Sequence, residues 1–187
     1  MSSNLLTPDF LRKIQNGDIE AFETLFRAYF QRLVNFAYRF LRDIPTSENM
    51  VQDIFADIWR KRSRVNPDLD FKIYLYTAAK NRALKQLKRQ NIENDLRLEL
   101  NHSSNRPNTP FDDLNDSEIS EAISRGIENL PDKCRLIFAM NRFDGLTYKE
   151  IASALGISIK TVETQMGRAL KNLRKRLMHL LVSALIR

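Results

Sequence analysis

The side chains best suited to chemistry in this sequence lie near residue 160, and their chemistry is hydrogen bonding and charge rather than catalysis. Cations, hydroxyl groups and one carboxylate fall on the outward positions of a single predicted helix. Such groups match the donors and acceptors on base edges and the phosphates of DNA. Glu163 is acidic, which suits the amino group of cytosine rather than a phosphate. The candidate base-reading set is Lys160, Thr161, Glu163, Thr164, Arg168 and Lys171.

Two short helices must position these side chains, and the local sequence predicts both. Thr147 and Glu150 have the spacing of a capping box, which would begin the first helix. Gly156 fits the left-handed residue that ends a helix, and Ser158 can cap the next one. Two helices joined in this way form a helix-turn-helix, whose second helix enters the major groove of DNA. The inner side of that second helix is predicted to hold Val162, Met166, Ala169, Leu170 and Leu173.

The distribution of charge also favours a polyanionic partner. Residues 60–90 carry a net charge of +8, residues 91–118 carry −5 and residues 119–187 carry +6. Two basic blocks separated by an acidic one are typical of nucleic-acid binding, although plain solvated helix faces are the alternative. For the second basic block, which contains the helix-turn-helix, the alternative is a simple helical hairpin with a charged surface. The agreement of the caps, the glycine and the polar outer face disfavours that alternative.

Two tyrosines are interleaved with the cations of residues 60–90. Aromatic rings can stack on unpaired bases while cations hold the backbone. Helical spacing places Tyr74 beside Phe71 and Leu75, which favours a core position for Tyr74. Tyr76 is then the candidate base platform.

The rest of the composition argues against several classes of function. The chain has one cysteine, Cys134, and its two histidines lie far apart at positions 102 and 179. We therefore expect no disulfide, no metal site, no cofactor and no small-molecule substrate. No Gly-rich phosphate loop or catalytic constellation stands out, so no enzyme activity is expected. No apolar run approaches the roughly 20 residues of a membrane span and no secretion signal is recognisable, which predicts a cytoplasmic location.

Apolar periodicity predicts an all-α protein with two small helical domains joined by a flexible linker. Residues 1–90 would form the first domain. Asn, Ser, Asp and Pro residues gather in 91–118, which predicts a flexible, acidic linker. Residues 119–187 would form the second domain, which contains the helix-turn-helix.

Three long helices are expected in the first domain. The first begins after Asp18, and its wide apolar stripe predicts that it is mostly buried. Pro45 would break the chain, so that Thr46 or Ser47 caps the second helix, which runs to about residue 61. The third helix is expected over residues 70–89.

Several of these stretches resemble the RNA polymerase sigma-70 family, in its extracytoplasmic-function (ECF) subgroup and particularly in the form abundant in Bacteroidetes. Residues 130–152 resemble sigma region 4, and residues 18–26 resemble the start of sigma region 2. Residues 51–59 resemble the polymerase-binding helix of region 2, and residues 71–81 its promoter-melting helix. The resemblance implies a sigma factor that binds core RNA polymerase and directs promoter recognition, DNA melting and transcription initiation.

The resemblance also implies which residues contact each partner. The base-reading set would recognise the −35 element of promoter DNA. Asn81 could equally be a structural hydrogen bonder, and the acids of the polymerase-binding helix could be ordinary solvated side chains. Core RNA polymerase would be bound by Asn49, Gln52, Asp53, Ile54 and Asp57. The −10 element would be bound by Asn66, Lys72, Tyr76, Lys80, Asn81, Lys88 and Arg89.

Members of that family are commonly held inactive by a membrane-anchored anti-sigma factor, so such a partner is expected. The acidic linker would be either a plain spacer or a segment threaded near the polymerase active-site cleft. The alternative function is a stand-alone helix-turn-helix transcriptional regulator. Such a regulator would bind a palindrome as a dimer, whereas a sigma factor needs an asymmetric pair of promoter elements.

Overall fold

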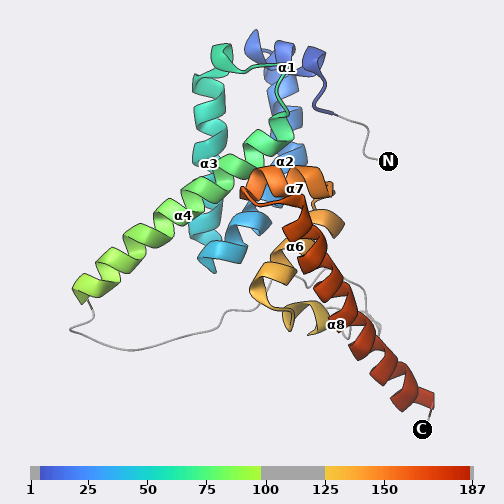
Figure 1. Cartoon of the computed structure of the whole chain (residues 1–187). Helices are drawn as coiled ribbons and strands as arrows, with labels where there is room; N and C mark the ends of the chain where they lie inside the picture. The colour runs from blue at the N-terminus through green and yellow to red at the C-terminus, as the bar shows by residue number, and fades with distance from the viewer. Residues whose placement is uncertain (1–4, 98–124, 186–187) are drawn as a thin grey trace. The chain divides into compact units, whose positions relative to one another are not determined.

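The computed structural model of the chain describes residues 5–97 and 125–185. The chain divides into two compact units, residues 1–107 and residues 108–187 (Figure 1). Every regular element within the described ranges is a helix, which confirms the predicted all-α fold. None of the helices in those ranges is both long enough and apolar enough to cross a membrane.

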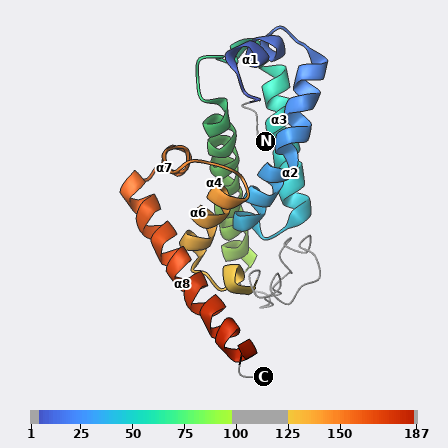
Figure 2. The same ribbon diagram turned by 90° about the vertical axis from the view of Figure 1, so that its right-hand side faces the viewer.

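The first unit is a bundle of three long helices, with a short helix and a 3-10 turn that contact each other. α2 and α3 run alongside each other, and α4 packs against both (Figures 1 and 2). Burying each large apolar side chain between them contributes about 1.5–3 kcal/mol. In chain order the elements are α1 (Pro8–Gln15), α2 (Ile19–Leu41), α3 (Ile44–Arg60), η1 (Arg62–Arg64) and α4 (Phe71–Arg97). The core of the unit includes Leu25, Leu33, Phe36, Val51, Ile54, Phe55, Leu75, Ala79 and Ala83.

Two residues make the turn from α2 to α3. Arg42 ends α2 in the left-handed conformation with φ 55°, and Asp43 caps α3 by accepting the amide of Thr46 at 2.8 Å. The prediction that Thr46 or Ser47 caps this helix is therefore wrong. Pro45 lies inside the first turn of α3, where its missing N–H needs no partner, so it does not break the helix.

The third long helix continues further than the sequence predicts. Asp70 caps α4 by accepting the amide of Ile73 at 3.1 Å, and the helix then runs to Arg97 rather than ending near Arg89. No glycine or proline occurs between Asp68 and Arg106, so nothing in the sequence stops the helix at residue 89. The first residues of the expected linker are thus helical, and residues 98–118 lie outside the described part of the chain.

The second unit contains the predicted helix-turn-helix. Thr147 Oγ1 accepts the amide of Glu150 at 3.2 Å, and Glu150 Oε2 accepts the amide of Thr147 at 2.6 Å. Gly156 ends the first helix with φ 70°, and Ser158 Oγ caps the second by accepting the amide of Thr161 at 3.1 Å. The capping box, the glycine turn and the serine cap are all confirmed. The elements are α6 (Asp132–Arg142), α7 (Tyr148–Leu155) and α8 (Ile159–Leu185).

The core of the second unit forms where α6 and α7 pack against α8. The Cys134 thiol on α6 donates to Gln165 Oε1 on α8 at 3.0 Å. Leu170 was expected on the inner side of α8, yet it is 41% exposed. The buried residues follow one another at steps of three or four positions, and this series does not include position 170. The buried stripe consists of Val162, Met166, Ala169 and Leu173.

The capping box gives a direct test of local stability. Replacing Thr147 with Ala removes the oxygen that accepts the Glu150 amide, and we expect the second unit to lose about 1 kcal/mol of unfolding free energy. Thr147→Ser keeps the oxygen and should retain most of the stability. Urea unfolding of the full chain measures both, with the exposed mid-helix change Ser153→Ala as the control. Wild-type stability in Thr147→Ala would show that the cap contributes nothing.

Candidate nucleic-acid interface and partner-binding helix

The exposed face of α3 carries three of the residues expected to bind polymerase. Asn49, Gln52 and Asp53 are spaced by three and four residues, lie on the same side of the helix and are all exposed. Ile54 is only 2% exposed and packs in the bundle core. The structure therefore corrects the expectation for Ile54: its side chain holds α3 in place and is not available to a partner.

Asp57, the fifth residue of that set, is half-buried and already engaged within the unit. Its carboxylate accepts hydrogen bonds from Arg60 on its own helix and from Arg82 on α4. Burial raises the pKa of Asp57, but the hydrogen bond and charge of Arg82, with the charges of Arg60 and Lys61, outweigh burial and hold the pKa below its ordinary value. Asp57 thus links α3 to α4, which makes it a positioning residue for the exposed face.

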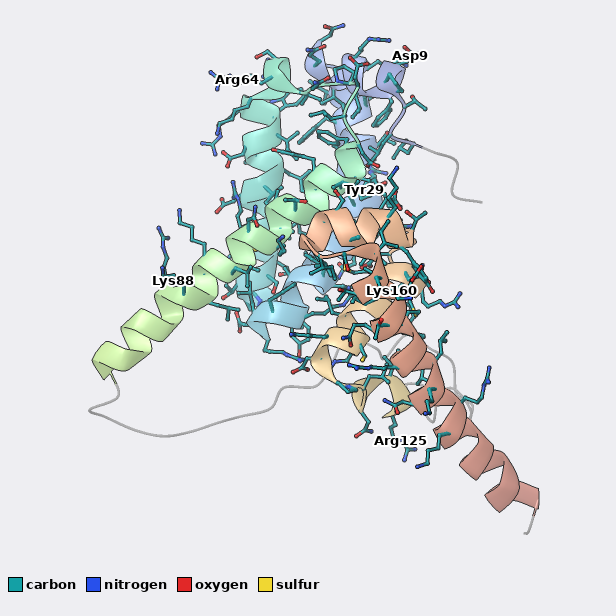
Figure 3. The ribbon with its side chains drawn as sticks, viewed as in Figure 1. Asp9, Tyr29, Arg64, Lys88, Arg125 and Lys160 are labelled. Atoms are coloured by element: carbon teal, nitrogen blue, oxygen red, sulfur yellow. The ribbon has the colours of Figure 1, made fainter. Side chains whose placement is uncertain are left out.

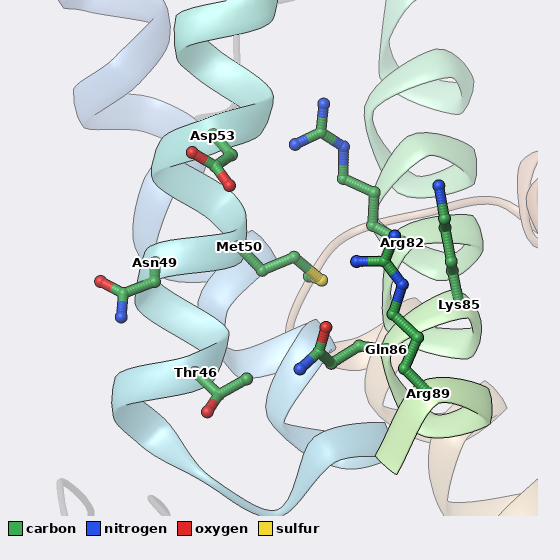
Figure 4. Close-up of a pocket in the computed structure, with 8 residues that line it drawn as sticks. All are labelled: Thr46, Asn49, Met50, Asp53, Arg82, Lys85, Gln86 and Arg89. Atoms are coloured by element: carbon green, nitrogen blue, oxygen red, sulfur yellow. The ribbon is translucent and has the colours of Figure 1, made fainter. Parts of the chain in front are cut away.

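A groove of about 510 Å³ lies between α3 and α4, shown in Figure 4. The α3 side offers polar groups and one carboxylate, whereas the α4 side offers three cations. Arg82, Lys85 and Arg89 are among the cations of residues 60–90 that were expected to hold a nucleic-acid backbone, but the groove that they form with α3 was not expected. Their spacing was a usable signal, because both walls repeat at i, i+3, i+4 and i+7. The walls are formed by Thr46, Asn49, Met50 and Asp53 on α3, and by Arg82, Lys85, Gln86 and Arg89 on α4.

The two tyrosines of α4 exchange the environments expected of them: Tyr76 is buried and Tyr74 is exposed. Tyr76 is fully buried, with its ring edge-on to Phe36 at a centroid distance of 5.1 Å, so it cannot be a base platform in this structure. Tyr74 is 49% exposed and stacks on Phe71 at 5.2 Å. Tyr76 is buried because α4 packs on α2 and α3 at once, which widens the buried stripe of α4 to include position 76.

The remaining residues expected at the −10 element lie on the surface of α4 or in the loop before it. Asn81, Lys88 and Arg89 are exposed, and Lys88 projects from α4 in Figure 3. Lys72 and Lys80 are half-buried. Such side chains can bury their aliphatic part and still extend the ammonium group to a partner. These positions are compatible with a nucleic-acid surface, and their contacts with DNA stay a prediction.

The loop that contains Asn66 is held by contacts that the sequence did not reveal. Gln15 Nε2 on α1 donates to the carbonyls of Ser63 at 3.4 Å and Val65 at 3.2 Å. Asn66 is exposed, and its Oδ1 accepts the amide of Asp68 at 3.0 Å in a local turn. A glutamine fifty residues away leaves no local pattern, which is why sequence analysis missed it.

The base-reading set of the second unit is exposed in full along the first turns of α8. Lys160 is labelled at the start of this helix in Figure 3, and its Nζ lies 3.8 Å from Glu163 Oε2. Thr164 Oγ1 donates to the Lys160 carbonyl at 2.8 Å, so its hydroxyl is oriented and keeps its lone pairs for a partner. The structure thus brings together Lys160, Thr161, Glu163, Thr164, Arg168 and Lys171 on one accessible helix, opposite the buried stripe.

Comparison with family models matches each unit to a different region of one family. Residues 25–92 match "Sigma-70 region 2", and residues 120–173 match "Sigma-70, region 4". Among curated proteins, the chain is 26% identical over 183 residues to the RNA polymerase sigma-H factor of Pseudomonas aeruginosa, covering 93% of this chain and 95% of that protein. It is 25% identical over 176 residues to the ECF RNA polymerase sigma factor SigW of Bacillus subtilis, covering 89% and 94%.

Solved structures share the fold, two of them with a bound partner. The structure of CnrH in complex with the cytosolic domain of CnrY matches with a TM-score of 0.61 and 21% identity, covering 93% of this chain and 98% of that one. The sigma factor RpoE in complex with the anti-sigma factor NepR from Bartonella quintana matches with a TM-score of 0.64 and 18% identity, covering 86% and 98%. The narrower resemblance to Bacteroidetes proteins stays a prediction.

The link between Asp57 and Arg82 makes the first unit sensitive to acid. A carboxyl whose folded pKa is lowered adds stability above its unfolded pKa of about 3.9, and this contribution is lost as the pH falls through the folded pKa. We therefore expect wild type to be more stable than Asp57→Asn at pH 7, and the difference to shrink below about pH 4. Chemical unfolding of both chains between pH 7 and about pH 3 measures this, and a difference independent of pH would contradict the link.

Proposed function

The chain belongs to the sigma-70 family of RNA polymerase sigma factors, in its ECF subgroup, and from this membership we propose how its two units divide the work of initiation. The first unit binds core RNA polymerase through the exposed face of α3 and holds the opened −10 element along α4. The second unit binds the −35 element with the start of α8. The single observation that supports this most is the match of regions 2 and 4, in family order, to one chain.

The chemistry of each surface supports this assignment. Asp53 on α3 can meet a basic partner helix, because exposed carboxylates steer and orient such contacts. Lys88 and Arg89 on α4 can hold a phosphate backbone while Tyr74, rather than Tyr76, offers a ring to an unstacked base. The exposed hydroxyl, carboxylate and cationic groups of α8 suit base edges and phosphates in the major groove.

We extend the proposal to the organisation of the chain. Residues 1–90 act as the −10 and polymerase-binding domain, residues 91–118 as the acidic connection, and residues 119–187 as the −35 domain. The chain adds no catalysis of its own, and its curated relatives are named as sigma factors. It works in the cytoplasm, where core polymerase and promoter DNA are found.

An anti-sigma factor is the proposed inhibitor of this chain. CnrH and RpoE, whose folds are similar to this one, were both determined with a bound partner, and the partner of RpoE is named an anti-sigma factor. Anchoring of the inhibitor in the membrane is part of the proposal. A stand-alone regulator is disfavoured, because such a protein has no need of a region 2 unit like residues 25–92.

Promoter selection with purified components tests the function. Core RNA polymerase and a random-sequence duplex library are incubated with or without the full chain, and bound duplexes are sequenced. We expect enrichment of two different elements at a fixed spacing, only when chain and core polymerase are both present. Enrichment of a palindrome by the chain alone would instead support the stand-alone regulator.

The exposed acid of α3 gives a test of polymerase binding. Asp53→Asn keeps the shape of the side chain but removes its charge, and we expect affinity for core polymerase to fall about fivefold or more. Binding is measured by titrating labelled full chain with core polymerase. Glu20→Gln, an exposed acid on α2, is the matched control and should bind as wild type does. Equal affinity of Asp53→Asn and wild type would remove Asp53 from the interface.

A further inference from the structure

One glycine of this chain has no structural reason for its place among the residues that the structure describes. Gly167 lies inside α8, about two turns from the start of the helix. Glycine in a helix interior destabilises the fold relative to alanine, because it loses more backbone freedom on folding. Gly167 is exposed, its backbone is helical, and a Cβ built there would meet no atom of the described residues within 4 Å. Alanine would therefore fit the free protein and make it more stable.

The other four glycines have evident reasons. Three of them adopt positive φ angles, which side chains rarely tolerate: Gly17 at 87°, Gly145 at 68° and Gly156 at 70°. A Cβ on Gly126 would lie 3.1 Å from Leu173 Cδ2, so a side chain there would press on its neighbour. Gly167 alone among the five is neither strained nor crowded within the part of the chain that the structure describes, and the described residues supply no reason for it.

The surroundings of Gly167 indicate what approaches it. Helical spacing places it on the side of α8 opposite the buried stripe, with Thr164 three residues before it and Lys171 four residues after it. Lys160 lies two turns earlier on the same side. Glu163, the acid of the base-reading set, lies four residues before it, and the exposed Leu170 lies three residues after it. Gly167 is thus in the middle of the base-reading set, at a point where the helix presents no side chain.

We propose that Gly167 is the point at which the backbone of α8 comes closest to the sugar-phosphate backbone of the −35 DNA. The inference rests on the proposed function of this helix and adds a positioning residue to it. Without a Cβ, the helix can sit deeper against the groove wall, so that the shorter side chains on either side reach their partners. A methyl group at this position holds the helix away from the DNA and lengthens all of those contacts together.

This role predicts opposite changes in stability and in DNA binding. In Gly167→Ala, the melting temperature of the second unit should rise by about 3–8 °C, because alanine favours the helix. The affinity of the holoenzyme for promoter DNA should fall about fivefold or more, comparable with the loss of one base-pair match. Gly167→Gln, a longer side chain with good helix propensity, should lose more affinity than Gly167→Ala.

The measurement uses holoenzyme made from core polymerase and the full chain. The probe is a duplex that wild-type holoenzyme selects from the random library, compared with the same duplex scrambled at the −35 element. Asn172→Ala is the matched control: Asn172 is exposed on α8 outside the base-reading set, and the change favours the helix without adding bulk. It should raise the melting temperature and leave the affinity unchanged.

The outcomes separate this inference from the proposed function. Loss of affinity for the intact duplex by a more stable Gly167→Ala, with no change for the scrambled duplex, supports the inference. Wild-type affinity in Gly167→Ala overturns it, as does a loss of affinity that accompanies a loss of stability. If wild-type holoenzyme selects no duplex, the proposed function fails first and this inference falls with it.

Discussion

The packing of α4 against both α2 and α3 is the constraint on which the first unit depends. Leu75 and Tyr76 fill the space that α4 shares with its two neighbours, and the Asp57–Arg82 ion pair closes the outer side of its contact with α3. The helix expected to hold DNA and the helix expected to hold polymerase are therefore parts of one rigid body. The exposed acid on α3 and the cations on α4 face a common groove because of this packing.

The second unit could be predicted closely because its signals are local. Thr147, Glu150, Gly156 and Ser158 each act within three or four residues of their own position, so the sequence itself contains the geometry. The exposed side of α8 follows directly from the positions of these caps. Leu170 was misplaced, since the edge of a buried stripe depends on how a neighbouring helix sits.

The first unit was harder to predict because its decisive contacts are distant in sequence. Tyr74 and Tyr76 were assigned to the wrong environments, since α4 contacts two helices and the periodicity of one helix describes only one face. Asp57 looked like a surface acid until Arg82, twenty-five residues later, was found beside it. Gln15, which holds the loop near Asn66, lies 50 residues before the Val65 carbonyl that it contacts.

The two-residue turn between α2 and α3 has a mechanical consequence. With Arg42 already in the left-handed conformation and Asp43 already committed to capping, the connection has no slack. A force that a bound partner exerts on α3 should therefore be transmitted directly to α2, because no extendable hinge separates the two helices. The α2–α3 hairpin should therefore tilt as one body.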